Sequence, residues 1–238
     1  MPDRFVQLSQ CDVKKDILFI DEILGVKLAL ADHRSSNVTL EELIRLASDA
    51  RVAGMLSGKT GIVTLHMGDD PQGLNKVFDA IKQTAIPAKV FHPTHVTRNP
   101  VLFEQALDFL ELGGWIDLTA GSRKEKSCGE EIALAKQRGL DTRRITISSD
   151  GQGSWSNYDA RGNLTQIGVS SVKTLHEQLV RMVKENDFDL AEALSYVTSN
   201  PADALQLSRK GRLREGMDAD IVLLDNDLAI DTVIARGQ

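Results

Sequence analysis

The chain has 238 residues, of which 42% are hydrophobic and 26% are charged, as is usual for a water-soluble globular protein. Its net charge of −6 argues against a nucleic-acid or anionic-membrane partner, and no apolar run approaches the roughly 20 residues that a membrane span needs. Two cysteines without metal-ligand or disulfide spacing, and a start without signal-peptide features, predict a cytoplasmic protein.

Apolar runs typical of strands alternate with helical patterns over the first 150 residues. The strand patterns cover residues 26–30, 61–67, 88–96, 115–120 and 144–150. Helical patterns follow the first four, over residues 39–58, 73–84, 100–114 and 129–139, and in the first of these Thr39 is a plausible N-cap and Gly58 a plausible stop. Strands and helices in series predict a parallel sheet with helical crossovers. Both an open doubly wound sheet and part of a (β/α)8 barrel fit this pattern.

The pattern changes after residue 150. Residues 151–163 are rich in glycine, serine and asparagine and are expected to form a loop. Residues 171–186 and 189–207 are amphipathic helical patterns, the second broken before Pro201. Residues 218–238 predict two strands with a turn at Asn226 and Asp227.

Residues that can bind metals or carry protons stand in the predicted strands or at their ends. They are Lys27, His66, His92, His95 and Asp150. Parallel α/β folds build ligand sites at the carboxyl ends of their strands, and imidazole and carboxylate groups suit zinc and related divalent ions. A nearby carboxylate can then move the proton of a metal-bound water. The pattern predicts a metal site at this edge, whereas His33, His92 and His176 are interpreted as structural.

Several ordered motifs resemble one enzyme family. The run "TSNPADALQL…KGRLREGMDADIVLLD" resembles the closing signature of the amidohydrolase superfamily, metal-dependent hydrolases on a (β/α)8 barrel with a small β-sandwich. The segments "GVKLALADHRSS", "LHMGD", "PTHVTRN" and "SSDGQGS" together resemble its isoaspartyl dipeptidase branch. The resemblance implies a zinc-dependent hydrolase that cleaves β-aspartyl (isoaspartyl) peptide bonds with a zinc-activated hydroxide.

The resemblance also assigns metal-binding roles. That family holds two zinc ions bridged by a carbamylated lysine, a role that falls here to Lys27. Zinc ligation falls to His66 and His95, and Asp150 becomes both a metal ligand and the catalytic acid and base. A free lysine ammonium has three donors and no acceptor, so only the carbamate makes Lys27 a sensible ligand.

Substrate binding is assigned in the same way to Arg34, Arg98 and Ser154. An isoaspartyl dipeptide must present a carboxylate, and the planar fork of an arginine matches that group. The expected partners are therefore small peptides, with no nucleic acid and no membrane. The resemblance also implies that the full-length proteins of the family are homo-oligomers.

The His-x-His pair that the family carries on its first barrel strand does not occur in this sequence. Only strands resembling the fourth to eighth are found, so we expect an N-terminally truncated relative. Residues 1–212 would form a partial barrel with its C-terminal helices, and residues 213–238 part of the β-sandwich. Such a chain would bind at most about one zinc ion. The alternatives are an inactive fragment, or an amidohydrolase for another amide such as a cyclic amide or an N-acetyl sugar.

Overall fold

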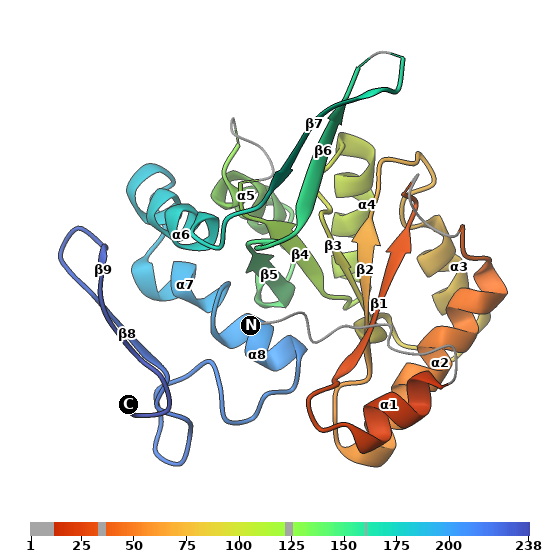
Figure 1. The fold of residues 1–238 in the computed structure, drawn as a ribbon, viewed down its shortest axis with the longest axis horizontal. Helices are drawn as coiled ribbons and strands as arrows, with labels where there is room; N and C mark the ends of the chain where they lie inside the picture. Colours follow the sequence, from red (N-terminus) through yellow and green to blue (C-terminus); the bar gives the residue numbers. More distant parts are fainter. Residues whose placement is uncertain (1–11, 33–36, 122–125, 160) are drawn as a thin grey trace.

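A computed structural model describes residues 12–32, 37–121, 126–159 and 161–238 of the chain. Its centre is a five-stranded parallel sheet in the order β1-β2-β3-β4-β5 (Figure 1). The strands are β1 (Gly25–Leu30), β2 (Ile62–Met67), β3 (Phe91–Thr94), β4 (Ile116–Thr119) and β5 (Ile145–Ser148). Consecutive strands are neighbours in the sheet, which is the order of a barrel and not that of a doubly wound sheet. The predicted partial (β/α)8 fold is confirmed.

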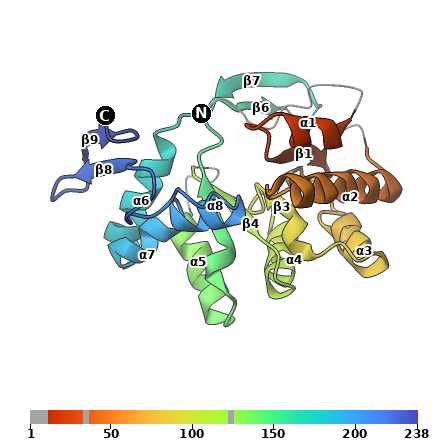
Figure 2. The ribbon, with the colours of Figure 1, turned by 90° about the horizontal axis from the view of Figure 1, so that it is seen from below.

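Helices connect these strands and form an arc along one side of the sheet (Figure 2). They are α2 (Leu40–Ser57), α3 (Asn75–Gln83), α4 (Pro100–Glu111) and α5 (Cys128–Gln137), with α1 (Val13–Phe19) before β1 and short 3₁₀ turns η1 (Ala88–Val90) and η2 (Thr142–Arg144) before β3 and β5. Helix α2 begins and ends as its sequence predicts. Thr39 and Glu42 form a reciprocal capping box, and Gly58 takes the left-handed conformation that closes the helix.

The two faces of the sheet differ in chemistry. Apolar residues of alternate positions, such as Val63, Leu65 and Met67, are fully buried in the core cluster that also contains residues of the helices. The intervening positions are mostly polar, and the strand register aligns them across the sheet, with Lys27 beside Thr64 and Asp117 beside Thr146. Because side chains alternate between faces along a strand, the second face is a polar layer.

Residues 151–163 were predicted to be a loop, and that prediction is wrong for residues 154–158, which form a strand. Strands β6 (Ser154–Tyr158) and β7 (Leu164–Val169) form an antiparallel hairpin that projects beyond the sheet (Figure 1). Trp155 lies against Gly168, where any side chain would overlap its indole ring. This pairing of a large ring with a glycine supports strands where composition alone favours a loop.

The C-terminal elements follow the predicted order. Helices α6 (Thr174–Glu185), α7 (Leu190–Ser195) and α8 (Ser199–Ala204) lead to the antiparallel pair β8 (Ile221–Leu224) and β9 (Ile230–Ile234). His176 lies 2.8 Å from the carbonyl oxygen of Leu228, which ties α6 to the β8–β9 turn and agrees with a structural role. The division of the chain at residue 212 stays a prediction.

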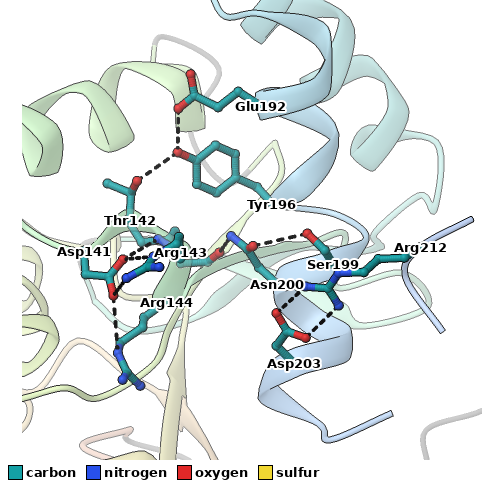
Figure 3. Close-up of polar contacts among 11 residues, drawn as sticks. Asp141, Thr142, Arg143, Arg144, Glu192, Tyr196, Ser199, Asn200, Asp203 and Arg212 are labelled. Carbon is teal, nitrogen blue, oxygen red and sulfur yellow. Dashed lines mark hydrogen bonds and ion pairs between the residues drawn. The ribbon is translucent and has the colours of Figure 1, made fainter. Parts of the chain in front are cut away.

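A polar network joins these helices to the amino end of β5 (Figure 3). The buried side chain of Asn200 donates to the Ile145 carbonyl oxygen at 2.9 Å, and the Tyr196 hydroxyl bonds Thr142 and Glu192. Burial raises the pKa of the Tyr196 hydroxyl, which therefore stays protonated.

In the part of the chain that the structure describes, no helix is long and apolar enough to cross a membrane.

Candidate active site at the carboxyl edge of the sheet

A cavity of about 350 Å³ opens at the carboxyl edge of the sheet. Its walls come from β1, β2 and the segment between β5 and β6, and its lining residues are Lys27, Ala29, Asp32, His66, Asp150, Gly153 and Ser154. Four residues singled out in the sequence, Lys27, His66, Asp150 and Ser154, therefore share one cavity. This edge is where barrel enzymes place their chemistry.

Two imidazole rings meet beside the cavity. Nε2 of His95 lies 3.0 Å from Nδ1 of His66, and the rings meet edge to face with centroids 4.4 Å apart. Nδ1 of His95 lies 2.8 Å from the buried hydroxyl of Thr119. The two histidines thus present nitrogen atoms to the same small volume.

An acid and a guanidinium lie on the other side of His66. Oδ2 of Asp32 is 3.3 Å from Nε2 of His66 and 3.7 Å from Nη1 of Arg98. Nη2 of Arg98 is 3.5 Å from the same ring nitrogen of His66. Arg98 is therefore next to the cavity, as a residue that contacts a substrate must be.

Three strand ends at this edge carry a non-glycine residue in the left-handed backbone region. They are Ala31 after β1, His95 after β3 and Asp150 after β5, with φ of 55°, 62° and 47°. This conformation costs an L-residue about 1–2 kcal/mol and is often found where function fixes a side chain. Gly153 completes the turn, because a Cβ there would lie 2.6 Å from Oδ1 of Asp150.

A second buried carboxylate connects the strands beneath the cavity. Asp117 accepts hydrogen bonds from the hydroxyls of Thr94, Thr146 and Ser148 at 2.6 to 2.7 Å. The Thr146 hydroxyl donates its one proton to the Asp117 carboxylate, so it can only accept from Nε2 of His92, which lies 3.1 Å away. Burial lowers the pKa of His92, although Asp117 opposes the shift. His92 is a neutral member of the polar layer, which fits its structural interpretation.

Sequence reasoning found most of these side chains and missed several. Arg34 and His33 lie outside the residues that the structure describes. Asp32, Asp117 and Thr119 were given no role. For Asp117 and Thr119 the missed signal was a polar residue at every second position of strands whose other positions are apolar, since strands of parallel sheets are usually apolar on both faces.

The chemistry of the donors agrees with a divalent metal. Two convergent imidazole nitrogens suit zinc, and Lys27 and Asp150 line the adjoining cavity. Within the described ranges, no three His, Cys, Asp or Glu side chains form a group that could hold a metal ion. As a carbamate, whose oxygens are acceptors, Lys27 would add a ligand beside the two histidines.

Comparison with known proteins identifies the family. A model of the amidohydrolase family matches residues 14–238. The chain belongs to the amidohydrolase family. Metal-dependent hydrolysis is general to this family, and the parallel sheet and polar edge described above are in keeping with it.

Two solved structures of a β-aspartyl dipeptidase are similar to this chain. One from Fervidobacterium islandicum AW-1, in complex with a β-Asp-Leu dipeptide, is 42% identical, with a TM-score of 0.90 over 96% of this chain. A second structure of the β-aspartyl dipeptidase from that organism is 39% identical, with a TM-score of 0.84. The chain spans 61% of the length of the first structure and 59% of the second. The resemblance to the isoaspartyl dipeptidase branch is confirmed.

Two further proteins are similar over a shorter stretch or at lower identity. An α-D-ribose 1-methylphosphonate 5-triphosphate diphosphatase of Escherichia coli K12 is 35% identical over 98 residues, which are 36% of this chain and 26% of that protein. An N-acetylglucosamine-6-phosphate deacetylase of Pasteurella multocida, at 18% identity, covers 91% of this chain with a TM-score of 0.60 and shares the fold.

Proposed function

We propose that this amidohydrolase cleaves β-aspartyl (isoaspartyl) dipeptides with the help of zinc. The observation that carries the proposal is the shared cavity of Lys27, His66, Asp150 and Ser154, with Arg98 in contact with His66. The 42% identity to a β-aspartyl dipeptidase supports the choice of substrate over other amides.

Lys27, His66, His95 and Asp150 are the residues that would hold the metal. Reaction of the Lys27 amine with carbon dioxide releases a proton and leaves a carbamate whose oxygens can bind cations. A bound zinc ion lowers the pKa of water and polarises a carbonyl oxygen. These four residues come from β1, β2 and the segments that follow β3 and β5, so the sheet brings them together, and His95 and Asp150 have left-handed backbone.

The chain's own groups would bind the peptide and move protons. Asp150, which lines the cavity, would take a proton from the attacking water and pass it to the leaving amine nitrogen. Arg98 would bind a substrate carboxylate through its planar fork, and Ser154, which lines the cavity, would donate a hydrogen bond to the substrate.

The test is an assay of the 238-residue chain with β-Asp-Leu, supplied with zinc chloride and bicarbonate. Activity on β-Asp-Leu that a chelator abolishes, with none on α-Asp-Leu, is the expected result. The control is Asp150→Asn, which should lower kcat on the order of 10²-fold or more because proton transfer typically contributes that much. Hydrolysis of hydantoins or N-acetyl sugars instead would replace the proposed substrate, and an inert but folded and zinc-loaded chain would refute the activity.

A further inference from the structure

Asp32 lines the cavity with a side chain that is only 1% exposed, and nothing in the preceding assignments uses it. Its carboxylate contacts both His66, a proposed metal ligand, and Arg98, a proposed substrate-binding residue. Burying a carboxylate is costly unless it is paired. The two contacts supply that pairing and place Asp32 between the two halves of the proposed site.

The backbone holds Asp32 in place by several independent constraints. Ala31 before it is left-handed, and its carbonyl oxygen accepts from the Asp70 N–H at 2.9 Å. The Leu30 carbonyl accepts from the Gly68 N–H at 3.0 Å. A Cβ on Gly68 would overlap the backbone of Ala31 and Asp32, so only glycine lets the end of β2 come this close. The backbone that follows β2 therefore fixes the position of Asp32.

The contact with Asp32 favours one position for the proton of His66. A carboxylate oxygen can only accept, so a hydrogen bond across this 3.3 Å contact needs the proton on Nε2 of His66. A neutral imidazole carries one N–H, so in this form Nδ1 of His66 is an acceptor that faces Nε2 of His95 at 3.0 Å. The lone pair of such an acceptor is what a metal ligand must offer.

A rival arrangement exists in the same contacts. Nη2 of Arg98 could donate to a bare Nε2 of His66 across 3.5 Å, which would put the proton on Nδ1 and block metal binding there. The Asp32 contact is shorter, and Nη1 of Arg98 faces the same carboxylate oxygen. The geometry therefore favours the Nε2–H form.

His95 differs from His66 in its outer partner. A threonine hydroxyl such as that of Thr119 can donate or accept, so it permits either tautomer of His95. Without metal, Nε2–H of His95 can donate to Nδ1 of His66. Offering Nε2 to a metal would require the His95 proton to move to Nδ1, where Thr119 can accept it.

We propose that Asp32 is a positioning residue that fixes His66 as its Nε2–H tautomer and keeps Nδ1 open for a metal, while His95 changes tautomer when metal binds. The proposal rests on the proposed function, since it concerns the same site. Carboxylate partners of metal-binding histidines act in this way in other proteins, and their removal typically lowers metal affinity 10- to 100-fold.

The experiment is long-range ¹H–¹⁵N NMR of the chain with ¹⁵N-labelled histidine, first with chelator and then with zinc chloride. The chain has five histidines, which single His→Gln variants assign. Wild-type His66 is expected as Nε2–H in both states, with His95 changing from Nε2–H to Nδ1–H on addition of zinc. A protonated Nδ1 on metal-free wild-type His66 would overturn the proposal without any variant at Asp32.

Asp32→Ala should abolish the tautomer preference of His66 and weaken zinc binding 10- to 100-fold in competition with a chromophoric chelator. Asp70→Asn is the matched control, because Asp70 caps the nearby backbone N–H of Gln72. The His92 and His176 signals report folding, since both rings have partners away from the cavity. An unchanged His66 spectrum in folded Asp32→Ala would refute the role. Tautomers are read without substrate, so a chain that shows them but does not cleave β-Asp-Leu supports the positioning role and counts against the proposed function.

Discussion

Arg98 shows how much of the proposed chemistry depends on the shape of one side chain. Its guanidinium reaches Asp32 and His66 through two different nitrogens, which a single ammonium cannot do. We expect Arg98→Lys to raise the KM for β-Asp-Leu about 10-fold or more, since the charge is kept and the planar fork is lost. Steady-state kinetics beside Arg161→Lys, a change in the β6–β7 turn, checks this. Equal kcat/KM in wild type and Arg98→Lys would argue against a carboxylate clamp.

His92 gives a prediction about pH. Burial lowers its pKa in the folded chain, whereas the unfolded chain has an ordinary value near 6.5. Between these two values the unfolded state binds more protons, so stability rises with pH and is lost as the pH falls below about 6.5. Urea unfolding between about pH 5 and pH 7.5 should show this slope, and it should be shallower in His92→Gln. Parallel slopes in the two proteins would contradict the prediction.

Some residues of the candidate site could be predicted from the sequence, and others could not. Lys27, His66, His95 and Asp150 could be found because each polar group interrupts or ends an apolar run. No role could be predicted for Asp32, because its proposed role depends on a contact with His66. That contact forms only when β1 pairs with β2. Asp117 stands in a similar position, since its three hydroxyl partners come from two other strands.

At the scale of elements, the closing motif "TSNPADALQL" acts through Asn200. This buried side chain holds α8 to the first residue of β5, at the end of the strand opposite the cavity. Asn200→Ala should lower the free energy of unfolding by about 1–3 kcal/mol, because it leaves a buried carbonyl without its donor. The control is Asn157→Ala, whose side chain is exposed in the hairpin and should matter by less than about 0.5 kcal/mol. Chemical denaturation measures both, and similar losses would remove the special role of Asn200.

Elements whose signals are local were predictable, and those that depend on pairing were not. Helix α2 could be bounded from Thr39 and Gly58 because capping is set by residues within one turn. The β6–β7 hairpin was missed because its stabilising contact, Trp155 on Gly168, joins residues thirteen positions apart in a polar stretch. The five-stranded sheet could be predicted because strand and helix patterns alternate several times, so an error in one pattern does not change the predicted fold.

At the scale of the whole molecule, the described sheet is open. In the ranges the structure covers, β1 and β5 each pair with only one neighbour, and the β6–β7 hairpin exposes Leu164, Ile167 and Val169. Unpaired strand edges and exposed apolar side chains favour association. We predict that the 238-residue chain associates in solution and binds at most about one zinc ion per chain. Light scattering after size exclusion, with metal analysis of the same fractions, tests both. A monomeric chain with two tightly held zinc ions would contradict the prediction.

The left-handed residues at the strand ends have a consequence for laboratory evolution. Ala31, His95 and Asp150 occupy backbone that glycine adopts without strain, so selection for heat resistance alone should favour glycine there. Selection for turnover should oppose the same change at His95 and Asp150, whose side chains the proposed chemistry needs. Ala31 has no such side chain to lose, yet its conformation aims Asp32 at His66. Populations evolved under the two pressures should therefore diverge at these three codons before they diverge in the helices.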